Sequence, residues 1–258
     1  MDPYGFAVKI VREAGAVLLR ARDKEFKTMM KGENPRDVVT TVDFAVNEYI
    51  INALKKQFPG ESVCSEEGDG SKTSSKAVWM LDPIDGTANF SRGIPHYAIC
   101  IGRLENNVPT VGAVYNPVTN ELFSFKKAEG AFLNNIPIKV SATTDLKDAS
   151  VFLHAGRNPE LLEWGGASYT KLLRVAKKTS NYSGSALDAC FVAAGRIEAN
   201  IYGNLTTMDI TAAIGILLEA GGRVVNDKGE PVTFSTEPQK IVMSNNPEIE
   251  AAVLKLLF

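Results

Sequence analysis

Cysteine and histidine are scarce in this chain of 258 residues, which contains three cysteines and two histidines. Cys64, Cys100 and Cys190 are odd in number and widely spaced, with no CxxC pair, which excludes a disulfide framework and a zinc site. We expect buried thiols in a reducing compartment, with a Cys100–Cys190 redox pair as the alternative. His96 and His154 come with no Gly-x-Ser-x-Gly segment, which disfavours a serine hydrolase, and we expect both to be structural.

The sequence also lacks an excess of charge and a long hydrophobic run. Its formal net charge is -2 and no basic block is present, which disfavours binding to a nucleic acid polymer. Charged residues interrupt the apolar positions of residues 1–26, unlike in a signal peptide, and no run approaches transmembrane length. We therefore expect a cytoplasmic protein that acts on a small substrate and binds no membrane.

What is present is the composition of a soluble globular protein, with 45% hydrophobic and 22% charged residues. The length suits one compact unit built from two packed halves, which we place at 1–146 and 147–258. Apolar spacing and turn residues predict helices near 3–21, 42–58, 161–178, 187–194, 207–220 and 249–257, and strands near 77–81, 97–102, 110–115, 122–125, 150–154, 197–202 and 241–244. The strands from 97 to 125 read as an antiparallel meander, and 31–41 as a loop or hairpin. Helices and strands that alternate in blocks predict stacked α and β layers.

Three acidic clusters lie at the ends of predicted elements: Glu66 with Glu67, Asp82 with Asp85, and Asp209 at the start of an apolar helix. Each has an ordinary explanation, as a solvated loop, an Asp-Pro turn or a helix N-terminal acid. Together they place acids beside apolar elements without a neighbouring basic residue. Divalent cations such as magnesium, which prefer oxygen ligands, would resolve this.

The segment Asp82-Pro83-Ile84-Asp85-Gly86-Thr87 adds a phosphate-binding feature. Its two carboxylates can face one point, the Ile84 carbonyl can join them, and Gly86 allows close approach of a ligand. A helix that begins near Gly86 would direct free N–H groups at a phosphate. The segment predicts a metal-dependent phosphoryl-transfer site. Haloacid-dehalogenase-type phosphatases need Asp-x-Asp-x-Thr, and the acids here are one residue too far apart.

These residues resemble those of the inositol monophosphatase family, which includes archaeal-type fructose-1,6-bisphosphatases. The resemblance covers nearly the whole chain, and its motifs are Asp37–Asp43, Ser65-Glu66-Glu67, Trp79–Phe90 and Met208–Ala213 followed by Glu219–Gly222. It implies a five-layer αβαβα sandwich, two to three Mg²⁺ ions, inhibition by lithium and a homodimer.

The resemblance also implies a role for each site residue. The metal ligands would be Glu66, Asp82, the Ile84 carbonyl, Asp85 and Asp209. Glu66 and Thr87 would orient the attacking water, with Asp43 supporting Thr87, and no phosphoenzyme would form. The Gly86 and Thr87 amides would bind phosphate, and Asp85, Ser185, Ala186 and Tyr202 would face the substrate.

Two positions depart from the family pattern. Met208 replaces a common tryptophan, and Tyr202 replaces the acid that contacts substrate hydroxyls in inositol-type enzymes. These departures argue against a strict preference for inositol phosphate. The leading hypothesis is a phosphatase for inositol 1-phosphate, fructose 1,6-bisphosphate or both. One alternative is a nucleotide phosphatase for 3'-phosphoadenosine 5'-phosphate, 2'-AMP or NADP, with Tyr202 stacking on adenine. The other is a non-catalytic interaction role.

Overall fold

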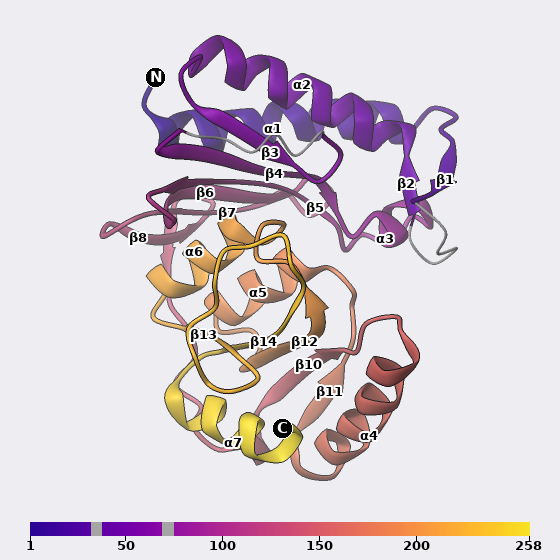
Figure 1. The fold of residues 1–258 in the computed structure, drawn as a ribbon, viewed down its shortest axis with the longest axis vertical. Helices are drawn as coiled ribbons and strands as arrows, with labels where there is room; N and C mark the ends of the chain where they lie inside the picture. Colours follow the sequence, from indigo (N-terminus) through magenta and orange to yellow (C-terminus); the bar gives the residue numbers. More distant parts are fainter. Residues whose placement is uncertain (32–37, 69–74) are drawn as a thin grey trace.

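The computed structural model describes residues 1–31, 38–68 and 75–258 (Figure 1). Asp37 and nearly all of the predicted Lys31–Arg36 loop lie outside the described residues. The helices are α1 (Pro3–Arg22), α2 (Thr41–Gln57), α3 (Thr87–Ser91), α4 (Pro159–Val175), α5 (Ser185–Ala193), α6 (Thr211–Glu219) and α7 (Pro247–Leu257), with a short 3-10 turn, η1 (Leu146–Asp148). The strands are β1 (Thr28–Met30), β2 (Val38–Thr40), β3 (Ser62–Ser65), β4 (Ala77–Asp85), β5 (Ala98–Glu105), β6 (Val108–Asn116), β7 (Glu121–Lys126), β8 (Gly130–Leu133), β9 (Ile136–Ile138), β10 (Ser150–His154), β11 (Lys178–Ser180), β12 (Ala199–Leu205), β13 (Arg223–Asn226) and β14 (Gln239–Ser244).

Helices α1 and α2 form the first layer, as the apolar spacing predicts. Asp2 caps α1 by accepting a hydrogen bond from the Gly5 amide, and Pro3 occupies the first helical position, where no N–H is needed. Thr40 and Asp43 form a capping box at the start of α2. The apolar faces of both helices pack on one face of a seven-stranded sheet.

The seven strands of this sheet lie in the order β3-β4-β5-β6-β7-β8-β9, with β3 parallel to β4 and all later pairs antiparallel. The predicted meander is confirmed. Side chains on its strands alternate between the layers: Ile99 and Ile101 face the first helical layer, whereas Cys100 faces the opposite core. Burial on both faces explains why these strands are apolar at nearly every position.

Helices α5 and α6 form the central layer, between the large sheet and a five-stranded sheet in the order β11-β10-β12-β14-β13 (Figure 1). Most of their residues are apolar because both sides of each helix are covered, and Asp188 on α5 is a buried exception. Helices α4 and α7 cover the far side of the smaller sheet. The predicted αβαβα sandwich of five layers is thus confirmed.

Two predicted element boundaries were wrong. The strand expected to stop before Asp82 continues through Asp85, with a register shift against β5 between these two residues. The helix expected from residue 207 begins only at Thr211, so Asp209 lies in the preceding turn. Asp209 therefore lies just before α6 and not in its first turn, where it is still near the positive end of the helix dipole.

Within the part of the chain that the structure describes, no helix combines the length and apolarity required to cross a lipid bilayer. The predicted boundary between 1–146 and 147–258 falls at η1, between the last strand of the large sheet and the first strand of the small one. The division into two halves stays a prediction. Helices α5 and α6 from the second half pack on the sheet of the first half.

The central layer supplies a test of the fold. Ile216 is fully buried in α6, whereas Leu218 on the same helix is 48% exposed. We expect Ile216→Ala to lower the free energy of unfolding by about 2–5 kcal/mol, because it leaves a cavity between the sheets. The control Leu218→Ala should change it by no more than about 0.5 kcal/mol. Urea titrations of both variants measure the difference, and equal effects would contradict this assignment of the central layer.

Candidate active site

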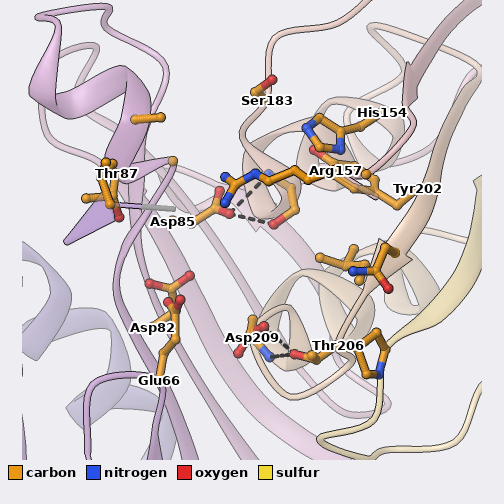
Figure 2. A pocket seen from close by; sticks show the side chains of 18 of the residues that line it. Glu66, Asp82, Asp85, Thr87, His154, Arg157, Ser183, Tyr202, Thr206 and Asp209 are labelled. Atoms are coloured by element: carbon orange, nitrogen blue, oxygen red, sulfur yellow. Dashed lines mark hydrogen bonds between the residues drawn. The ribbon is translucent and has the colours of Figure 1, made fainter. Parts of the chain in front are cut away.

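A cavity of about 710 Å³ opens where the end of β4 faces the ends of β10 and β12 (Figure 2). Its volume lies within the range typical of small-molecule sites. One wall carries the predicted acids and the β4–α3 turn. The opposite wall is built from the segment that follows β10 and from β12. Among the predicted site residues, the following line the cavity: Glu66, Asp82, Ile84, Asp85, Gly86, Thr87, Ser185, Tyr202 and Asp209.

The turn from β4 into α3 is held by its own short-range contacts. The Ile84 amide donates to Asp82 Oδ1 at 3.0 Å, which fixes the carboxylate against the backbone. Gly86 has φ +86°, and a Cβ there would lie 2.9 Å from the His96 carbonyl oxygen. Only glycine fits this position without strain. The turn directs Gly86, Thr87 and Asp85 toward the same space.

The Thr87 hydroxyl lies between two acceptors. Its Oγ1 is 2.9 Å from the Ile84 carbonyl oxygen and 3.2 Å from Asp43 Oδ1. Asp43 is 1% exposed and does not line the cavity, and its other oxygen accepts from the Thr40 amide at 2.8 Å. Burial raises the Asp43 pKa to about 6, against the opposing hydrogen bonds from Thr40. Asp43 is therefore placed to orient Thr87 from behind rather than to touch a ligand.

Asp85 is held by the start of α5, one hundred residues later in the chain. Its Oδ1 accepts from the Ser185 amide at 3.0 Å and from the Ser185 hydroxyl at 2.5 Å, and its Oδ2 accepts from the Ala186 amide at 3.0 Å. Burial raises the Asp85 pKa to about 6, although these hydrogen bonds lower it. These hydrogen bonds fix the carboxylate in place.

These hydrogen bonds correct one expectation. Ser185 and Ala186 were predicted to face the substrate, but both amides and the Ser185 hydroxyl donate to Asp85. Ser185 still lines the cavity, whereas Ala186 is fully buried and does not. The start of α5 therefore mainly holds the Asp85 carboxylate in place. Sequence reasoning missed this because no local pattern joins residues so far apart.

Asp82, which is buried, and Asp209, which is partly buried, also have raised pKa values. Burial raises the pKa of Asp82 well above its usual range, and the nearby charges of Glu66, Asp85 and Asp209 raise it further. Burial and then Glu66 raise the pKa of Asp209 to about 7, against a hydrogen bond from the Thr206 hydroxyl. Mutual repulsion of this kind indicates that the four acids share one region.

Lys31, which directly follows β1, places a positive charge beside Glu66 and Glu67. Lys31 Nζ lies 2.8 Å from Glu66 Oε1 and 2.8 Å from Glu67 Oε1. Burial opposes the charged ammonium, but Glu66 and Glu67 raise the pKa of Lys31 above its usual value. One carboxylate oxygen of Glu66, Oε1, is therefore directed toward Lys31.

The donor set fits a hard divalent cation. It consists only of oxygens: four carboxylates and the Ile84 carbonyl, which has a second acceptor position beside its contact with Thr87. As the side chains stand, no three acidic, histidine or cysteine side chains converge tightly enough to enclose an ion, a statement that covers residues 1–31, 38–68 and 75–258. The fit consequently rests on the chemistry of the donors and on the repulsion among the acids.

The opposite wall contains residues that the sequence analysis did not select for the site. His154, Gly156, Arg157 and Asn158 follow one another at the end of β10 and the start of α4. Gly-Arg-Asn-Pro before a helix is a turn signal that could have pointed to this wall. Tyr202, on β12, stacks on His154 with ring centroids 5.1 Å apart.

The expectation for the remaining histidine fits its surroundings, and so does that of buried thiols for Cys100 and Cys190, whereas Cys64 is only partly buried. His96 Nε2 lies 2.8 Å from Asp188 Oδ1, in a buried pair behind the cavity. All three cysteines are free, and burial raises the pKa of Cys100 and Cys190, which keeps both as thiols. A redox pair between them therefore gains no support from their surroundings.

Several known proteins are similar to this chain in sequence and in fold. The chain is 32% identical over 251 residues to an inositol-1-monophosphatase of Bacillus subtilis, an alignment that covers 96% of this chain and 94% of the relative. It is 30% identical to a fructose-1,6-bisphosphatase/inositol-1-monophosphatase of Thermotoga maritima, with 89% and 87% covered. It is 33% identical to a protein of Xylella fastidiosa named Nus factor SuhB, with 86% and 81% covered.

The crystal structure of extragenic suppressor protein suhB from Bartonella henselae superposes with a TM-score of 0.90 at 28% identity, covering 98% of this chain and 97% of that one. The model of the inositol monophosphatase family matches residues 3–257, which is almost the full sequence. With the acid-lined cavity, these matches identify the chain as a member of the inositol monophosphatase family and a phosphoric monoester hydrolase.

Proposed function

We propose that the chain is a magnesium-dependent phosphatase for polyol or sugar phosphates, with inositol 1-phosphate and fructose 1,6-bisphosphate as candidate substrates. The observation that carries this proposal is the set of buried, repelling carboxylates at one end of a cavity of small-molecule size. The names of the Bacillus and Thermotoga relatives support these two substrates. A homodimer in the cytoplasm remains an expectation from the family resemblance.

Glu66, Asp82, the Ile84 carbonyl, Asp85 and Asp209 would hold two to three Mg²⁺ ions. When bound, the ions would lower the pKa of water and stabilise negative charge on the phosphate oxygens and the leaving oxygen. Magnesium suits the site because it accepts a few carboxylates and retains several waters.

The chain's own residues would then position the reaction. Thr87 Oγ1, held by Asp43 at 3.2 Å, would orient the attacking water together with Glu66. Gly86 and Thr87 line the cavity beside Asp85, and their amides are candidate donors to the phosphate oxygens. Attack on phosphorus by water breaks the bond to the leaving alcohol directly, without a phosphoenzyme. Lys31 contacts Glu66 Oε1, which leaves Glu66 Oε2 for this role.

The nucleotide alternative depended on Tyr202 as an adenine-stacking ring. Tyr202 is 4% exposed, its ring already stacks on His154, and its hydroxyl donates to Asp188 Oδ2 at 3.2 Å. Little of the ring is left for a purine, which favours the sugar or polyol hypothesis. The name of the Xylella relative supports an interaction role as the other alternative, in which the cavity would be dispensable.

A substrate panel tests the proposal directly. We expect phosphate release from inositol 1-phosphate or fructose 1,6-bisphosphate with Mg²⁺, loss of turnover with a chelator, and inhibition by lithium. The panel should also contain 3'-phosphoadenosine 5'-phosphate, 2'-AMP and NADP, compared by kcat/KM. A preference for these nucleotides would favour the alternative, and no turnover of any compound would sink the catalytic proposal.

Asp209 supplies a test of the metal site. We expect Asp209→Asn to lower kcat/KM by about 100-fold or more, since metal-assisted stabilisation of the transition state contributes several kcal/mol. Asp148→Asn is the matched control, because Asp148 is an exposed acid outside the cavity. If Asp209→Asn kept the activity of the control, Asp209 would have no part in the site.

Metal removal should change how stability depends on pH. Acids with a pKa raised to about 6 and about 7 bind protons more tightly in the folded chain than in the unfolded chain. Stability of the metal-free protein should therefore fall as pH rises from about 4 through about 7, and Mg²⁺ should restore most of it at about pH 8.

Thermal melts with chelator or Mg²⁺ at about pH 5.5 and about pH 8 measure this effect. The melting temperature should rise more with Mg²⁺ at the higher pH. In Asp209→Asn the chelated protein should show a weaker dependence on pH. An equal Mg²⁺ effect at both pH values would argue against cation binding by these acids.

A further inference from the structure

The segment that leads into α5 contains a residue with an unusual backbone conformation. Ser183, two residues before Ser185, has φ +57°, in the left-handed region that residues other than glycine rarely adopt. It lines the cavity (Figure 2), and its hydroxyl donates to Asn181 Oδ1 at 2.9 Å. A residue of this kind keeps a strained conformation only where its surroundings hold it there. The contacts that hold Ser183 therefore also decide where the residues that bind Asp85 lie.

Asn89 on α3 supplies such contacts from below the surface. Its side-chain amide donates to the Tyr182 carbonyl at 2.7 Å and to the His96 carbonyl at 2.8 Å, with a longer contact of 3.3 Å to the Ser183 carbonyl. Asn89 is 8% exposed and is not a lining residue of the cavity. The peptide groups before and after the Ser183 Cα are thus held by one side chain, which fixes both backbone dihedral angles between them.

His96 confines the same segment from the other side. A Cβ on Gly184 would lie 2.6 Å from His96 Cδ2, so the imidazole packs directly against this backbone. The ring is fixed in turn by Asp188 on α5, whose Oδ1 lies 2.8 Å from His96 Nε2. The backbone between Tyr182 and the start of α5 is therefore enclosed by Asn89 and His96.

Asn89 belongs to the same turn as the acid that this segment holds. The Asn89 backbone N–H donates to the Gly86 carbonyl at 2.9 Å, directly after Asp85. The Asn89 side chain then reaches the segment at Ser183, and the start of α5 reaches back to the Asp85 carboxylate. The contacts form a closed ring, in which Asn89 is the link on the side opposite the carboxylate.

We infer that Asn89 is a positioning residue for the proposed hydrolysis: it holds Ser183 in the left-handed conformation, and this places the start of α5 where its N–H groups orient the Asp85 carboxylate. The inference rests on the proposed function, in which Asp85 is a metal ligand. Without the Asn89 amide, Ser183 would return to a negative φ, because the left-handed conformation is unfavourable for serine. The start of α5 would then turn away from Asp85.

Asn89→Ala tests this role with two measurements. One is kcat/KM for inositol 1-phosphate and fructose 1,6-bisphosphate, and the other is the dissociation constant of Mn²⁺, a probe that also prefers oxygen ligands, measured by electron paramagnetic resonance without substrate. We expect losses of about tenfold or more in both, as when other groups that orient a metal ligand are removed. Ser91→Ala is the matched control on α3, because the Ser91 hydroxyl donates to the Ala88 carbonyl within the helix. It should stay within about twofold of the wild type.

A second substitution separates positioning from packing. Ser183→Gly removes the cost of the left-handed conformation and should by itself leave both measurements within about twofold of the wild type. Combined with Asn89→Ala, it should restore most of the lost Mn²⁺ affinity and kcat/KM. Ala128→Gly is its control, since Ala128 has φ +63° in the turn between β7 and β8, far along the chain from this segment. Ala128→Gly should not reverse the effects of Asn89→Ala.

The outcomes are distinguishable. Recovery with Ser183→Gly but not with Ala128→Gly would support the inference. Asn89→Ala with the values of the Ser91→Ala control would overturn it, and so would the absence of a greater recovery with Ser183→Gly than with Ala128→Gly. If the melting curve shows that Asn89→Ala is unfolded, Asn89→Ser, which retains one donor, takes its place in the same comparison. If the Mn²⁺ measurements follow the expected pattern but the wild type hydrolyses none of the candidate substrates, the proposed function fails and the positioning of Asp85 stands.

Discussion

The contact between Asp85 and the start of α5 joins the two parts of the molecule on which the site depends. Three hydrogen bonds fix a buried carboxylate of β4 against backbone and hydroxyl groups from a segment one hundred residues later. The same contact positions α5 between the two sheets, and with it the β12 wall that carries Tyr202. The cavity has a defined width because its two walls are tied together at this point.

The sequence was sufficient for the layered architecture. Regular apolar spacing predicted α1 and α2, and the apolar runs of the meander predicted part of the large sheet. The predicted boundaries were wrong at the end of β4 and at the start of α6, both next to the candidate site. β4 continues to Asp85 because its pairing with β5 shifts register instead of ending, and no periodicity signals such a shift.

The acidic wall could be predicted because its residues form short, specific motifs, and the structure gathers them at one cavity. The opposite wall could not. His154 and Arg157 stand beside Tyr202 only because β10 and β12 are neighbours in a sheet whose order differs from the chain order. Lys31 was also missed as a partner of Glu66, since its contact spans thirty-five residues and depends on a three-residue strand.

Lys31 gives the acidic wall a tethered counter-ion. Its ammonium offsets part of the repulsion among the acids, so the chain does not depend on dissolved cations alone to fold around them. A divalent ion that binds through Glu66 Oε1 would compete with Lys31, whose local concentration is set by the short strand β1. The affinity of the site for a metal ion therefore depends on how strongly the Lys31 ammonium binds Glu66. Substitutions along β1 can change this affinity without altering any proposed metal ligand.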